Sequence, residues 1–202
     1  MAGSIRFGSL VAAVFVAVLG ENVFGEDMPL PTIGVRVHNQ AGARTELLDR
    51  AQQDVQRIFR EAGVQIAWLT STPEHSSGRF DVRILIRRKP MGLSAGPLVM
   101  GTTLGGTYET GGMSFVFLDR VLQRAHEREQ DVARLLAYAT AHEIGHLLLP
   151  YPAHSPTGVM RAEWNGDDLR YIANGVLRFT PAQDALIREK LAECCDRPVA
   201  SR

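Results

Sequence analysis

Residues 127–160 read EREQDVARLLAYATAHEIGHLLLPYPAHSPTGVM, and this stretch decides the fold. Its first part predicts a helix over about 127–149, which Pro150 and Pro152 end because proline cannot continue a helix. Apolar residues occupy several sides of that helix, which is typical of a helix buried within a domain. Inside it the pattern His-Glu-x-x-His occupies positions 142–146. Polar groups there require partners, because burying them without one costs free energy.

The spacing of the two histidines suits a metal ion. Residues four apart lie on the same face of a helix, so the imidazoles of His142 and His146 can reach one ion. Zn²⁺ accepts neutral imidazole nitrogens at about 2.0–2.1 Å and favours tetrahedral geometry. Glu143 is then placed to take a proton from a metal-bound water and pass it to a leaving amine. The alternative is a hydrogen-bonded core cluster of the same three residues.

A catalytic zinc site needs three protein ligands and an open fourth position. His154 stands eight residues beyond His146, so three of the six histidines in the chain lie within thirteen residues. We therefore expect His154 to be the third ligand. Carboxylates also bind zinc, which leaves three acidic residues further along as competing ligands: Glu163, Asp167 and Asp168.

The motif and the residues after it resemble the metzincin clan of zinc endopeptidases. HEIGH is followed by a histidine soon after the helix ends, and then by a turn over 155–160 that carries a methionine. The resemblance implies three metal ligands, a general base and a Met-turn residue beneath the metal: His142, His146 and His154, then Glu143, then Met160. The metzincin pattern HExxHxxGxxH has five residues between its second and third histidines, whereas this chain has seven. Leu149 also replaces the glycine of that pattern.

The remaining chain predicts an α+β fold around this helix. Alternating and β-rich patterns predict strands at about 32–38, 64–69, 80–87 and 114–118. A glycine-rich region allows a short edge strand at 98–103, which could pair with an extended peptide, or ordinary hairpin loops. Apolar spacing predicts a helix over 45–61, and a last helix starts at Pro181 with Thr180 as its cap. The resemblance implies one metzincin-like domain, in which a twisted mixed sheet of four to five strands carries a backing helix, an active-site helix and a C-terminal helix.

The first residues predict an export signal. Arg6 precedes the apolar run 10–19, and Val23-Phe24-Gly25 suits a signal-peptidase site. The run is about half of the roughly 20 residues that a membrane-spanning helix needs. We expect a signal peptide over residues 1–25 and a metallopeptidase domain over 26–202, with an uncleaved anchor as the alternative. The mature protein would then be secreted or periplasmic and would have no membrane anchor.

Composition excludes other classes of protein. The 22 Lys and Arg residues balance the 22 Asp and Glu residues. A protein that binds nucleic acid or anionic lipid usually has an excess of basic residues, and this chain has no such excess. The two cysteines, Cys194 and Cys195, are adjacent and cannot link distant parts of the fold. The domain must therefore be stabilised by its core.

Together these observations predict a secreted, monomeric, zinc-dependent endopeptidase that acts on a peptide or protein substrate. Two alternatives remain open at this point. One is a non-catalytic secreted domain with a structural zinc, in which a fourth protein ligand closes the site. The other is a zinc hydrolase of a non-peptide amide, because zinc and a carboxylate base serve either reaction.

Overall fold

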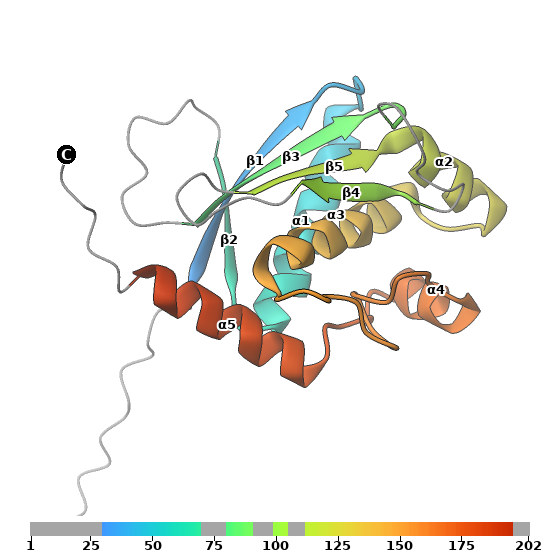
Figure 1. Ribbon diagram of the computed structural model, residues 1–202. Coiled ribbons are helices and arrows are strands. Elements are labelled where there is room, and N and C mark those ends of the chain that lie inside the picture. Colours follow the sequence, from blue (N-terminus) through green and yellow to red (C-terminus); the bar gives the residue numbers. More distant parts are fainter. Residues whose placement is uncertain (1–29, 70–79, 91–98, 105–111, 196–202) are drawn as a thin grey trace, which may run out of the picture.

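The computed structural model describes residues 30–69, 80–90, 99–104 and 112–195, and Figure 1 shows how their elements are arranged. They form one five-stranded sheet with helices packed against it, so the predicted α+β fold is confirmed. The expected signal peptide, residues 1–25, lies outside the described residues. The strands are β1 (Thr32–Asn39), β2 (Gln65–Trp68), β3 (Phe80–Arg87), β4 (Gly101–Leu104) and β5 (Gly112–Phe117).

The sheet is mixed, with the strand order β2-β1-β3-β5-β4. β1 pairs in parallel with β2 and β3, β3 pairs in parallel with β5, and β4 runs antiparallel to β5 at one edge. Parallel neighbours need a crossover, which helix α1 (Thr45–Glu61) provides between β1 and β2. A polar residue, Ser114, lies on the buried face beside Ile84. The buried apolar residues of that face include Ile33, Val35, Ile66, Val82, Ile84, Ile86 and Val116.

Two long helices pack on this face of the sheet. α1 and α3 (Val132–Leu148) lie side by side beneath the strands (Figure 1). α3 also contacts α2, α4 and α5, so most of its 17 residues are buried. An ion pair joins the two helices, because Arg134 Nε of α3 lies 3.2 Å from Asp54 Oδ2 of α1. The predicted backing helix and the predicted buried helix are both confirmed.

The start of α3 differs from the prediction. A separate helix, α2 (Leu118–Glu127), ends where the long helix is predicted to begin, so the prediction is wrong at this end. Glu129 has a φ of 50°, which interrupts the helical path. Asp131 then caps α3, because its Oδ1 accepts a hydrogen bond from the Arg134 amide at 2.9 Å. The strand predicted at 114–118 is observed as β5.

Two further helices complete the fold, α4 (Gly166–Ala173) and α5 (Pro181–Cys195). α5 starts at the predicted residue, and Thr180 Oγ1 accepts a hydrogen bond from the Gln183 amide at 3.3 Å. α4 is not predicted by apolar spacing. It is supported by a capping box, in which the side chains of Asn165 and Asp168 each accept a hydrogen bond from the other's amide. None of the helices within the described ranges is long and apolar enough to cross a membrane.

The sheet edge nearest to α3 is β4 (Figure 1). The predicted strand at 98–103 is shifted along the chain, since β4 begins at Gly101 and residue 98 lies outside the described residues. Alternation along β4 leaves Thr102 exposed and turns Gly101 and Thr103 toward α3. The edge strand therefore places two small residues against the helix that carries the His-Glu-x-x-His pattern.

Candidate metal centre

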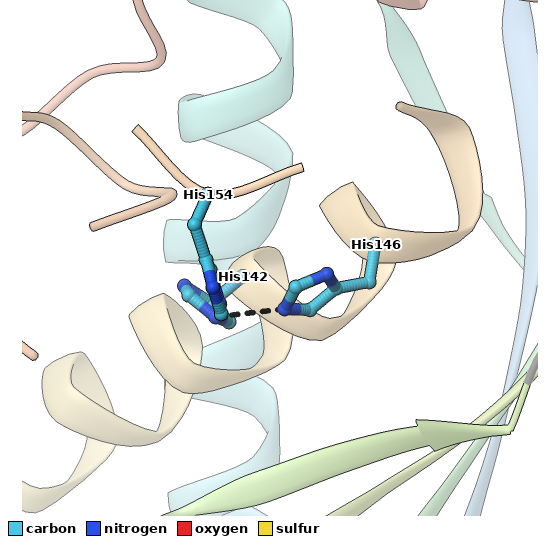
Figure 2. A group of neighbouring side chains, drawn as sticks. All are labelled: His142, His146 and His154. Carbon is cyan, nitrogen blue, oxygen red and sulfur yellow. Dashed lines mark hydrogen bonds between the residues drawn. The ribbon is translucent and has the colours of Figure 1, made fainter. Parts of the chain in front are cut away.

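Three histidine side chains converge near the C-terminal end of α3. His142 and His146 project from α3, and His154 meets them from the segment after the helix (Figure 2). One ligand nitrogen from each ring lies within 4.8 Å of the other two. The Nε2 atoms of His142 and His146 are 3.1 Å apart. The structure thus brings together the three histidines that the sequence singles out, and metal binding by them stays a prediction.

The ring of His142 is oriented by backbone. Its Nδ1 lies 2.8 Å from the carbonyl oxygen of Val159. A carbonyl oxygen only accepts, so Nδ1 carries the proton and Nε2 presents its lone pair toward the other two rings. Histidines that ligate metals almost always have their second nitrogen held in this way.

The carbonyl of Val159 belongs to a turn over 155–160. The amide of Ser155 donates to the carbonyl of Met160 at 3.0 Å and closes this turn. Gly158 has a φ of 81°, which a residue with a side chain rarely adopts. Met160 is fully buried beneath α3, where any side chain at Gly145 would collide with its sulfur. The methionine singled out by the sequence therefore packs directly under the histidine-bearing helix.

An extended segment carries His154 back to α3. Leu149 ends the helix with φ −94° and ψ 146°, whereas a glycine turn would have a positive φ. Gln183 of α5 then holds the segment, with its Nε2 lying 3.4 Å from the Ala153 carbonyl and 3.1 Å from Ser155 Oγ. These contacts lie on both sides of His154, so α5 holds the segment that makes the spacing between His146 and His154 longer.

The three competing carboxylates lie outside the histidine group. Asp168 is committed to the cap of α4 and pairs with Arg161, whose Nη1 is 3.4 Å from its Oδ2. Asp167 pairs with Arg170 on the exposed side of α4. Glu163 is exposed and lines the same cleft as the histidines. Among the described residues, the group with metal-ligand spacing contains histidines alone.

Burial keeps two of the rings neutral. The pKa of His142 is lowered to about 4, chiefly by burial; the hydrogen bond to Val159 opposes this shift, and the nearby rings of His146 and His154 contribute to it. Burial likewise lowers the pKa of His146 to about 4, with His154 adding to the effect. Both rings are therefore uncharged at neutral pH, which is the form that binds a metal ion.

The donor set fits zinc. Tetrahedral geometry with bonds of about 2.0–2.1 Å separates ligand nitrogens by about 3.3 Å. The observed 3.1 Å between the Nε2 atoms of His142 and His146 is close to that value. Three histidine nitrogens, in a described group that contains no carboxylate, match the number of protein ligands in a catalytic zinc site, which keeps one position open.

Glu143 lies between α3 and the edge strand and has 5% of its surface exposed. Its Oε2 accepts a hydrogen bond from Thr103 Oγ1 at 2.6 Å. Burial raises the pKa of Glu143 to about 7, and the Thr103 hydrogen bond opposes this rise. A carboxyl group with a pKa near neutrality can both accept and return a proton. The side chain also lines the same cleft as the three histidines.

That cleft has a volume of about 630 Å³. β4 forms one wall, and residues 161–164 form another. Trp164 in the second wall is anchored, because its Nε1 donates to the Val159 carbonyl at 3.2 Å. Its ring stands edge-on to His142 with the centroids 5.9 Å apart. The volume falls in the range of ligand sites, which is roughly 300–1,000 Å³.

Three residues beside Glu143 are missed by the sequence-based prediction: Gly101, Thr103 and Ser114. Ser114 has a recognisable signal, because it is a polar residue at a buried position of an apolar strand. Thr103 has none, since threonine is common in strands. Gly101 is one of several glycines in its region, so its role depends on where α3 lies.

Comparison with known proteins gives a distant structural likeness. No family model matches the sequence, and no curated protein matches it. Among solved structures, the crystal structure of metalloproteinase-II from Bacteroides fragilis aligns with 86% of this chain at 13% identity and a TM-score of 0.46. The chain spans 56% of the length of that protein. At this level of similarity no residue role is transferred from it.

Replacing Glu143 by glutamine should stabilise the metal-free protein at high pH but not at low pH. The carboxyl has a pKa of about 7 in the fold and 4.5 ordinarily, so between these values the native state holds more protons than the unfolded chain. Wild-type stability therefore falls as the pH rises through this window, and glutamine avoids the loss. Urea unfolding in chelator should show a difference of about 3 kcal/mol near pH 8.

The matched control is Glu163→Gln, which alters an exposed carboxylate lining the same cleft. It should leave the free energy of unfolding unchanged at both pH values. A stability difference for Glu143→Gln that did not vary with pH would contradict the prediction.

Proposed function

We propose that this chain is a zinc-dependent endopeptidase. The observation that carries the proposal is the convergence of His142, His146 and His154 beside the buried carboxyl of Glu143 in one cleft. Two of the rings are neutral, and Glu143 has a pKa near neutrality, so each group is in the protonation state or range that metal-assisted hydrolysis requires.

The proposed roles follow from these positions. Zn²⁺ held by the three imidazoles would polarise a scissile carbonyl and lower the pKa of water to about 7. Glu143 takes a proton from the attacking water and returns it to the leaving nitrogen. We assign this transfer to Oε1, because among the described residues the Thr103 hydroxyl donates to Oε2 and none donates to Oε1. Met160, packed under α3, would support the helix beneath the metal.

The edge strand favours a peptide substrate over another amide. Within the described residues, β4 pairs with β5 on one side only and borders the cleft on the other. An extended peptide can add to such an edge through main-chain hydrogen bonds, which a small amide cannot do. A structural zinc is less well supported, because closing the site requires a fourth protein ligand and the described group has three.

Replacing Glu143 by glutamine should abolish turnover but not metal binding. Loss of a general base costs about 10²- to 10⁴-fold in rate, whereas none of the three histidine ligands is altered. Casein or peptide hydrolysis and zinc content should be measured on the same preparations, with Glu163→Gln as the control that keeps both. Full activity in Glu143→Gln would remove this residue as the base, and a wild type without stoichiometric metal would refute the zinc proposal.

Replacing His154 by alanine should weaken zinc binding by more than the roughly 10- to 100-fold that loss of an outer-shell partner costs. Competition with a chromophoric chelator measures this affinity. Asp167→Ala is the control, because that carboxylate is exposed and paired with Arg170. If Glu163→Ala lost zinc while His154→Ala retained it, the third ligand would be the carboxylate.

Export is proposed from the sequence of residues 1–25. The apolar run and the cleavage site in that segment are typical of a signal peptide. Expression with the full leader in a bacterial host, followed by N-terminal sequencing of the periplasmic fraction, should give a mature chain that begins at Glu26. A chain retained in the membrane with its first residues intact would favour the uncleaved anchor.

A further inference from the structure

We propose that Thr103 is a positioning residue for Glu143, and that Ser114 holds Thr103 in place for this task. The two hydroxyls form a hydrogen-bonded chain from β5 through β4 to the carboxylate on α3. This inference rests on the proposed function, because it assigns the chain a role in orienting the base of that reaction.

The first link joins Thr103 to Glu143. Thr103 Oγ1 lies 2.6 Å from Glu143 Oε2, which is the distance of a strong hydrogen bond to a carboxylate. An ionised carboxylate has no proton, so Thr103 must be the donor when Glu143 acts as a base. Oε2 is then occupied, and no hydrogen bond to Oε1 is found from the residues that the structure describes.

The second link joins Ser114 to Thr103. Their oxygens are 2.8 Å apart, and the single proton of Thr103 is already directed at Glu143. Ser114 must therefore donate to Thr103. Its side chain is fully buried on the apolar face of the sheet, where a hydroxyl without partners would cost free energy. Ser114 Oγ also lies 3.3 Å from the backbone carbonyl of Glu143, but its single proton is directed at Thr103, the nearer acceptor at 2.8 Å.

The third observation is the space that β4 leaves for the carboxylate. A Cβ at Gly101 would lie 2.5 Å from Glu143 Oε1 and 2.6 Å from its Cγ. Glycine at this position therefore leaves room for the Glu143 side chain, while Thr103 two residues along holds one of its oxygens. The space left by Gly101 and the hydrogen bond from Thr103 together favour one orientation of the Glu143 side chain, which has several rotatable bonds.

Fixing the base in this way should appear in kcat. An oriented reacting group lowers the barrier, and an orientation lost through one hydrogen bond to a charged group costs about 10- to 100-fold. The proposed contacts between β4 and a peptide are main-chain hydrogen bonds, which a change of the Thr103 side chain leaves in place, so KM should change little. The hydroxyl chain would therefore affect the chemical step and not substrate binding.

The test compares zinc-loaded wild type with Thr103→Val, Thr103→Ser and Ser114→Ala. We expect Thr103→Val to lower kcat by about 10- to 100-fold at nearly constant KM and zinc content. Thr103→Ser keeps the hydroxyl and should restore kcat to within about threefold of wild type. Ser114→Ala leaves Thr103 as a donor and should lower kcat by an intermediate factor. If Thr103→Val did not fold, the other two variants would still test the proposal: a wild-type kcat in Ser114→Ala, or a kcat in Thr103→Ser far below wild type, would overturn it.

The matched control is Thr140→Val in α3. Thr140 is buried, and its hydroxyl donates to the Leu136 carbonyl at 2.8 Å, away from the cleft. This variant loses a buried threonine hydroxyl from the helix that carries Glu143, and it should keep wild-type kcat. An equal loss of kcat in Thr140→Val and Thr103→Val would mean that Thr103 has a structural role alone, and would overturn the proposal.

Crystal structures of the same variants give a readout that does not depend on activity. Glu143 should occupy one position in wild type and Thr103→Ser, and a displaced or divided position in Thr103→Val. Unchanged kcat and an unchanged Glu143 in Thr103→Val would overturn the positioning role while Glu143→Gln still tested the peptidase proposal. A wild type without peptidase activity would refute the proposed function, and the Glu143 positions would then show whether Thr103 orients this side chain.

Discussion

The burial of α3 is the constraint on which the rest of this structure depends. A helix that contacts the sheet, α1 and the C-terminal helices must satisfy every polar atom it carries. The backbone does this for itself, but two imidazoles and a carboxylate need partners from outside the helix. His142 obtains one from the carbonyl of Val159, and Glu143 obtains one from the hydroxyl of Thr103. The partners come from opposite sides, so the strand before α3 and the turn after it are both fixed relative to the same two residues.

The two segments that contact α3 orient different side chains: the turn over 155–160 orients His142, and β4 orients Glu143. The turn over 155–160 orients the ring of His142, one of the three proposed metal ligands. The edge strand orients the carboxylate, so it governs where a proton can be taken up. Gly145 belongs to the side of the turn, because it leaves room for Met160 to pack against the helix. The proposed metal site and the proposed base are thus supported by separate contacts, so a substitution can disturb one without the other.

Much of the fold could be predicted from the sequence, because its signals are local. The alternation in 32–38 and the apolar spacing in 45–61 depend on one element each, and both elements form where they are predicted. The boundary between α2 and α3 could not be placed, since helical residues lie on both sides and a single residue, Glu129, breaks the path. The histidines are recognisable because chemistry restricts their spacing. The role of Thr103 is not, because it depends on which strand lies beside α3, and strand order is a long-range property.

The contact between Gln183 and the segment around His154 has a consequence for the order in which the centre is assembled. During synthesis the two histidines of α3 leave the ribosome first, and His154 follows a few residues later. The side chain that braces the segment around His154 belongs to α5, which follows that segment in the chain. While α5 is undocked, the segment around His154 therefore lacks this brace, and His142 is oriented only once Val159 is also in place. The candidate metal centre can therefore be fully assembled only after α5 has docked on the segment around His154.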